Sequence, residues 1–146
     1  QAEMEVKSQN AAAWPILLDV NGNLAEGPGS NVFVVKDGML MTPRKQFVLA
    51  GISRHVTIEL AQELGIMVDE TDIDLFDAYT ADEVFVTSTS FCICPVSSVN
   101  GAIIGGGEVP GPITDRLTKA YSGLVGIDIT EQYLSRLGDK VETESI

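Results

Sequence analysis

Four groups of residues in this sequence could act together on a small charged molecule. Glu26 is a carboxylate directly before the turn sequence of residues 27–31. A Gly-Ile-Ser triplet, residues 51–53, opens a segment with helical spacing, and a hydroxyl-rich run occupies residues 87–90. Lys7 supplies an amine near the start of the chain. A carboxylate, a helix N-terminus, hydroxyl groups and an amine are the groups that could bind a phosphorylated ring carrying an aldehyde.

Each group has a definite chemical role in this interpretation. The Glu26 carboxylate could hold a protonated ring nitrogen through a charge-assisted hydrogen bond. The helix start at residues 51–53 offers N–H groups, the Ser53 hydroxyl and a positive dipole end to a phosphate, and residues 87–90 could complete the phosphate site. Lys7 could form a Schiff base with the aldehyde. Together these residues predict a site for pyridoxal 5′-phosphate, which accepts electrons while the protein tunes its ring.

Each signal also has an ordinary structural explanation. A single Glu at a loop edge is usually solvated, Ser53 could simply cap a helix, and Ser and Thr residues between strands commonly form turns. A lysine in a polar terminal stretch, such as Lys7, is normally solvated. His55, the one histidine, fits the exposed side of its helix better than a role as a base. Only the ordered set of residues therefore indicates a cofactor site.

The surrounding sequence predicts a strand-rich α+β domain with helices that cover the sheet. The predicted strands are short apolar runs, at residues 16–20, 24–26, 32–35, 39–41, 66–68, 84–87 and 93–96, with a further short strand at Ile73. Asn-Gly and Asp-Gly pairs at residues 21–22, 37–38 and 100–101 predict tight turns. The predicted helices are one that Ser53 caps and Gly65 ends, a short turn at residues 78–83, one that Thr114 caps, and one over residues 130–137.

Composition excludes several classes of protein. The chain has 146 residues, of which 45% are hydrophobic, so it can form one domain with a core. A net charge of −12 opposes binding to nucleic acid or an anionic membrane, and no apolar run of about 18 residues exists to span a membrane. Cys92 and Cys94, the two cysteines of the sequence, lie two apart and would point the same way on a strand, which predicts no disulfide framework and favours a reducing cytoplasm. No metal-ligand set is expected.

Taken in order, the segments resemble the class IV aminotransferases. These are fold-type IV pyridoxal-phosphate enzymes that include branched-chain, D-amino-acid and (R)-selective amine transaminases. The matching runs are LLDVNGNLAEGPGSNVFVVKDGMLMTP, LAGISRHVTIELAQELGI, YTADEVFVTSTSFCICPV and GEVPGPITDRL. The resemblance covers roughly residues 16–125 and corresponds to the family's cofactor-binding C-terminal domain. It implies a D-amino-acid aminotransferase-like α+β fold, with residues 1–146 as a single domain and the N-terminal domain absent.

The resemblance also implies a role for each site residue. Lys7, in the segment VKSQN, would be the Schiff-base lysine and the proton shuttle. Glu26 would bind the pyridine nitrogen and keep it protonated, and Leu49 would pack against the ring. The phosphate would receive donors from two turns of the chain, through Ile52, Ser53, Ser88 and Thr89.

The activity that the resemblance implies is amino transfer from an amino acid or amine to a 2-oxo acid through a lysine aldimine. The partners would be this amino donor and 2-oxo acid, in a cytoplasmic homodimer without nucleic acid or membrane. Two alternatives stay open. An enzyme of the aminodeoxychorismate-lyase type uses the same cofactor for elimination, and a truncated fragment could retain a cofactor site without catalysis.

One departure from the family concerns the segment that follows Lys7. In the family, a helix of a few turns separates the lysine from the strand that begins here at Ile16, whereas only residues 11–15 lie between Asn10 and Ile16. The nine steps from Lys7 to Ile16 span at most about 30 Å at ~3.3 Å each, so both residues could reach one site. We expect either missing residues in this segment or a truncated product, and an intact mass of 15.6 kDa would exclude the first.

Overall fold

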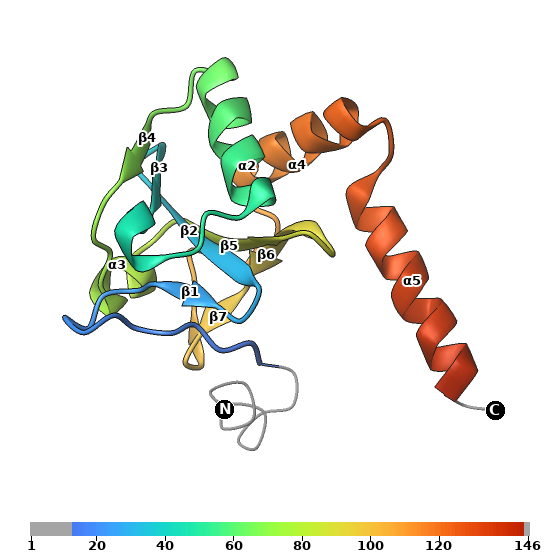
Figure 1. Ribbon diagram of the computed structural model, residues 1–146, viewed down its shortest axis with the longest axis horizontal. Helices are drawn as coiled ribbons and strands as arrows, with labels where there is room; N and C mark the ends of the chain where they lie inside the picture. Colours follow the sequence, from blue (N-terminus) through green and yellow to red (C-terminus); the bar gives the residue numbers. More distant parts are fainter. Residues whose placement is uncertain (1–12, 145–146) are drawn as a thin grey trace.

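A six-stranded sheet forms the centre of the molecule (Figure 1). The computed structural model describes residues 13–144, with side chains through residue 137. The main path of the sheet has the order β4, β3, β2, β5, β6, and β1 pairs with the beginning of β2. The strands are β1 (Glu26–Gly27), β2 (Ser30–Lys36), β3 (Met39–Thr42), β4 (Val68–Glu70), β5 (Glu83–Ser88) and β6 (Cys92–Val96), with β7 (Ser98–Val99) and β8 (Ala102–Ile103) in a separate ribbon.

Strand β2 is buried on both faces, because alternate side chains of a strand point to opposite sides of the sheet. Phe33 and Val35 belong to one apolar cluster, whereas Val32 and Val34 belong to another. Phe33 stacks on its register partner Phe85 in β5, with ring centroids 4.9 Å apart. The apolar run that predicted this strand therefore supplies two cores, one on each face of the sheet.

Two helices, α2 (Ile52–Glu63) and α4 (Pro112–Val125), pack against each other and cover the Phe33 side of the sheet. The short helices η1 (Lys45–Phe47) and α3 (Leu75–Tyr79) lie in the connections. Helix α5 (Ile129–Glu144) contacts α4 and β6 at its start and then extends away from the sheet (Figure 1). Within residues 13–144, no helix is long and apolar enough to cross a membrane.

Two of the three predicted tight turns have the expected hairpin geometry, and at residues 21–22 the turn is closed by the Gly22 N–H donating to the Asp19 carbonyl at 3.1 Å. Residues 37–38 and 100–101 both have positive φ angles, of 50° and 78° in the first pair and 49° and 80° in the second. Positive φ at both central residues is the geometry of a type I′ turn, which Asn-Gly and Asp-Gly favour. The antiparallel pairs β2–β3 and β7–β8 follow directly from these turns. Gly65, with a φ of 74°, follows the end of α2 as predicted.

Several predicted boundaries are wrong. Residues 16–20 form no named strand, because the Asp19 carboxylate accepts the N–H groups of Asn21 and Asn23 and leaves only one isolated bridge, between Leu18 and Leu24. The strand predicted at residues 66–68 is instead β4, and Ile73 lies in a loop. The helical turn predicted at residues 78–83 begins at Leu75, because Asp74 and Asp77 form a capping box.

The predicted helix caps are also wrong. Gly51 and Gly111 are the N-caps of α2 and α4, and Ser53 and Thr114 lie inside the first turns. In α4, the carboxylate of Glu83 takes the place of a local cap, since its oxygens accept the N–H groups of Ile113 and Thr114 at 3.1 and 2.8 Å. A side chain at Gly111 would overlap Glu83. The first N–H groups of α4 therefore bond to a residue of another element, β5, and no local sequence signal could show this contact.

Replacing Glu83 with alanine should destabilise the fold by about 2–3 kcal/mol, because hydrogen bonds to a charged group are lost and two N–H groups lose their acceptor. Glu83 is only 7% exposed, so water cannot easily replace the carboxylate. Urea unfolding measures the change in the free energy of unfolding. The matched control is Glu63→Ala at an exposed position of α2, which should stay within about 0.5 kcal/mol of the wild type. Equal stability of the two variants would contradict this role of Glu83.

Candidate functional site

Glu26 lies where β1 meets the loop that precedes α2. Its Oε2 accepts the backbone N–H of Leu49 at 2.9 Å, while its Oε1 has no hydrogen-bond partner among residues 13–144. Asn31, opposite Glu26 in the β1–β2 pair, donates from Nδ2 to the Leu49 carbonyl at 3.1 Å. The backbone N–H and the carbonyl of Leu49 are therefore both hydrogen-bonded, and the Oε1 of Glu26 stays available to a ligand.

The N-terminus of α2 follows this anchored loop. Its N-cap, Gly51, has extended backbone angles, and no side chain among the described residues accepts a hydrogen bond from the first turn. A side chain at Gly51 would approach the Asn31 amide oxygen to 2.6 Å, so glycine allows the loop to pass close to β2. The first N–H groups of a helix lack partners within the helix and favour an anion. The start of α2 can therefore bind an anionic group.

Ser53 joins α2 to the turn between β5 and β6. Its Oγ donates to the Ser88 carbonyl at 2.9 Å, and the Tyr121 hydroxyl of α4 donates to Ser53 Oγ at 3.3 Å. Burial raises the pKa of Tyr121, the bond to Ser53 lowers it, and the neighbouring Cys92 raises it. Tyr121 is therefore a neutral donor at neutral pH.

The β5–β6 turn provides the second hydroxyl-rich surface. The Oγ atoms of Ser88 and Ser90 lie 2.8 Å apart, and the Ser90 N–H donates to Ser88 Oγ at 3.2 Å. Thr89 is exposed at the tip of the turn. The hydroxyl of Thr87 is buried without a hydrogen-bond partner among the described residues, and Thr87 stands opposite Asn31 in the sheet. Register partners share a face, so this unused hydroxyl lies on the side of the sheet that α2 covers.

The structure brings most of the predicted site residues together. Contacts connect Glu26 with Leu49 and Ser53 with Ser88, and Ile52 and Thr89 are sequence neighbours of these residues. The side chains of Leu49 and Ile52 are 80% and 74% exposed, although both are apolar. The remaining predicted residue, Lys7, lies outside the described residues.

Two further residues belong to the site but were not predicted. Asn31 anchors Leu49, and its place at the end of the run EGPGSN is the signal that could have identified it. Tyr121 contacts Ser53 across 68 residues of sequence, and no local pattern connects the two. Its helical spacing with Leu117 in the sequence indicates only an apolar helix face. Leu124 and Val125, whose spacing would place them on the same face, are 62% and 46% exposed.

The donors and acceptors of this site fit an elongated ligand with an anionic end and a ring that donates a hydrogen bond. The uncapped start of α2 and the unused Thr87 hydroxyl can serve the anionic end, and the free oxygen of Glu26 can accept from the ring. The exposed side chains of Leu49 and Ile52 offer apolar surface in the loop before α2 and at its first residue. Within the described part of the chain, no group of three or more His, Cys, Asp or Glu residues could hold a metal ion.

The sequence is similar to proteins of a known family. The family model described as "Amino-transferase class IV" matches residues 1–99. The branched-chain-amino-acid aminotransferase of Escherichia coli (strain K12) is 48% identical over 110 residues, which are 75% of this chain and 35% of that protein. The chain therefore spans about a third of the length of this relative.

Solved structures show the same fold. The crystal structure of the Escherichia coli branched-chain amino acid aminotransferase matches 84% of this chain and 40% of that chain, with a TM-score of 0.80 and 44% identity. Another branched-chain amino acid aminotransferase, in complex with N-(5′-phosphopyridoxyl)-L-glutamate, matches 86% of this chain and 41% of that chain, with a TM-score of 0.79 and 36% identity. The predicted α+β fold of the aminotransferase type is thus confirmed.

Proposed function

This chain belongs to the class IV amino-transferase family, and on that basis we propose that it binds pyridoxal 5′-phosphate and serves amino transfer between an amino acid and a 2-oxo acid. The observation that carries the proposal is the pairing of two features at the ends of one short loop. Glu26 binds the loop at Leu49, and the uncapped helix N-terminus begins after Gly51. A carboxylate and an anion-binding helix end are what the two ends of this cofactor require.

Glu26 would orient the ring of the cofactor. Its Oε2 remains on the Leu49 N–H, and its free Oε1 would accept the proton of the pyridine nitrogen. A charge-assisted hydrogen bond of this kind favours the protonated ring. The protonated ring is the electron sink that the cofactor supplies when bound. The exposed Leu49 side chain would pack against the ring and exclude water from one face.

The phosphate would lie between the start of α2 and the β5–β6 turn. The N–H groups of Ile52 and Ser53 belong to the uncapped first turn, and Ser88 and Thr89 would contribute donors from the other side. Few local cations are required, because the helix end carries a partial positive charge. This arrangement agrees with the acidic composition of the chain, whose net charge is −12.

Lys7 would be the amine that attaches the cofactor, and its Nζ would then move the proton during amino transfer. The names of the relatives favour a branched-chain amino acid as amino donor. Residues 1–146 would form a cofactor-binding domain, in a cytoplasmic homodimer. The exposed apolar side chains of Leu17, Leu49 and Ile52 support a covering partner. Light scattering would measure the assembly, and a monomer would contradict the homodimer.

Titration of the 146-residue chain with pyridoxal 5′-phosphate should show saturable binding, with weaker binding of pyridoxal, which lacks the phosphate. Amino transfer from leucine to a 2-oxo acid should then follow cofactor loading. Calorimetry and product analysis are the measurements. A chain that binds pyridoxal as tightly as pyridoxal 5′-phosphate would contradict the phosphate site, and a chain that binds neither would contradict the proposed function.

A further inference from the structure

We propose that Tyr121 is a positioning residue for the phosphate end of the cofactor site. It lies in α4, outside the segments that supply ligand-binding groups, and its hydroxyl donates to Ser53 Oγ at 3.3 Å. Ser53 stands in the first turn of α2, where the phosphate would bind. This inference rests on the proposed function, because it concerns how the same site is held in shape.

The direction of the hydrogen bonds defines the role of each hydroxyl. A serine hydroxyl has one proton and can accept further bonds. Ser53 uses its proton on the Ser88 carbonyl at 2.9 Å, so it accepts from Tyr121. The three residues are almost fully buried, with exposures of 4% for Ser53, 6% for Tyr121 and 9% for Ser88. A continuous hydrogen-bonded chain therefore runs from α4 through α2 to the end of β5.

This chain of hydroxyls connects the two sides of the proposed phosphate site. One side is the first turn of α2, and the other is the turn that follows Ser88. The second side is itself braced, because Ser88 Oγ bonds to both the hydroxyl and the N–H of Ser90. The separation of the two sides depends on the Ser53–Ser88 bond, and Tyr121 holds Ser53 in the rotamer that makes it. The Ser53 hydroxyl thus acts on phosphate binding mainly by setting the separation between the first turn of α2 and the β5–β6 turn. The backbone N–H groups donate to the phosphate itself.

The surroundings of Tyr121 keep it suited to this role. Its ring is part of the apolar cluster that includes Leu117 and Phe85, which fixes the ring beneath α2. Burial raises its pKa, so the hydroxyl retains its proton at neutral pH and remains a donor. Hydrogen bonds in series within a low-dielectric interior strengthen one another. Removing the terminal donor should therefore weaken the Ser53–Ser88 bond without removing a ring from the core.

The test compares two ligands on the variant Tyr121→Phe. Pyridoxamine 5′-phosphate and pyridoxamine both lack the aldehyde, so their binding does not depend on a Schiff base, and they differ only in the phosphate. We expect the variant to bind pyridoxamine 5′-phosphate about twofold to tenfold more weakly, which corresponds to the loss of one hydrogen bond. Binding of pyridoxamine should stay unchanged. Calorimetry gives both affinities, and urea unfolding confirms that the variant is folded.

The matched control is Tyr133→Phe. The Tyr133 ring packs against Phe91, and its hydroxyl has no hydrogen bond to the described residues. This variant should bind both ligands as the wild type does. A second variant, Ser53→Ala, should show the same phosphate-dependent loss. The double variant should lose little more than either single variant, because the two hydroxyls act in one chain.

Three results would overturn the role of Tyr121. These are unchanged affinity of Tyr121→Phe for pyridoxamine 5′-phosphate, an equal loss for both ligands, and fully additive losses in the double variant. An equal loss would mean a general structural role. A wild-type chain that binds neither ligand would instead overturn the proposed function, and this inference with it. The two kinds of failure are therefore distinguishable.

Discussion

Replacing Lys7 with alanine should abolish covalent attachment of pyridoxal 5′-phosphate to this chain. Attachment requires a free amine within reach of the aldehyde. Two other lysines are engaged in the structure, since Lys36 donates to the Thr80 carbonyl at 2.7 Å and Lys119 pairs with Asp115 at 2.8 Å. Borohydride reduction of the loaded chain, followed by peptide mapping, would identify the attached lysine. We expect one modified peptide, the one that contains Lys7.

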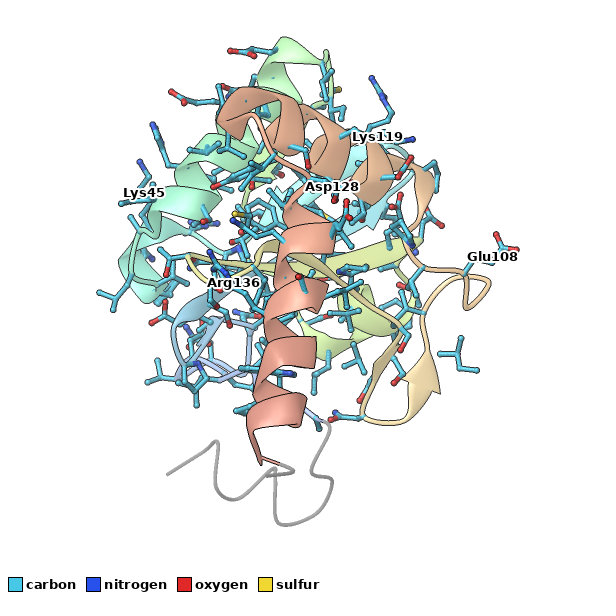
Figure 2. The ribbon with its side chains drawn as sticks, turned by 90° about the vertical axis from the view of Figure 1, so that its right-hand side faces the viewer. Lys45, Glu108, Lys119, Asp128 and Arg136 are labelled. Carbon is cyan, nitrogen blue, oxygen red and sulfur yellow. The ribbon has the colours of Figure 1, made fainter. Side chains whose placement is uncertain are left out.

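The control for this experiment is Lys45→Ala. Lys45 lies in η1, in the loop that leads to Leu49, and its exposed side chain is at the edge of the molecule (Figure 2). It is therefore the described lysine best placed to compete with Lys7. The control variant should be labelled at Lys7 as completely as the wild type. If the Lys7→Ala variant is labelled as fully as the wild type, and the label is on Lys45, then Lys45 and not Lys7 is the lysine that attaches the cofactor.

Replacing Glu26 with glutamine should lower the rate of amino transfer by roughly tenfold to a hundredfold. Glutamine can still accept the Leu49 N–H through its amide oxygen, so the loop before α2 should stay in place. The variant loses the negative charge that would keep the ring nitrogen protonated, and hydrogen bonds to charged groups contribute about 1.5–3 kcal/mol. Steady-state rates at saturating cofactor measure the effect, which should appear mainly in kcat.

A suitable control is Glu108→Gln. Glu108 is an exposed carboxylate in the loop before α4, on the opposite side of the view from Lys45 (Figure 2). This variant removes the same charge and should leave the rate within twofold of the wild type. Equal rates for Glu26→Gln and the wild type would show that Glu26 does not act on the ring. A large loss for both variants would indicate an effect of net charge.

Much of the fold could be predicted because its determinants are local. The Asp37-Gly38 and Asn100-Gly101 turns require positive φ angles that few residues adopt, so residue type alone was sufficient. The apolar run at residues 32–35 was sufficient to predict the strand β2, which is buried in the structure. The helix caps could not be predicted, because Glu83 reaches α4 from a strand about thirty residues earlier, as its 31-residue separation from Thr114 shows. Local patterns do not contain such contacts.

The chemical groups of the candidate site were determined by the sequence alone. The carboxylate of Glu26, the Gly-Ile-Ser triplet and the hydroxyl-rich run at residues 87–90 were all recognised from residue types and order. Their assignment to a cofactor depends on their sequence relationship to a family, and the family match over residues 1–99 agrees with it.

Only the tertiary structure decided how these groups are held. It showed that Glu26 and Asn31 both bind Leu49, across 23 and 18 residues, and that Ser53 bonds to Ser88 rather than capping its own helix. It also showed Tyr121 beside Ser53, 68 residues away in sequence. These contacts depend on the register of the sheet and on the packing of α4 against α2. Short sequence patterns specify turns and faces, but the partners of a buried polar group are set by which elements pack together.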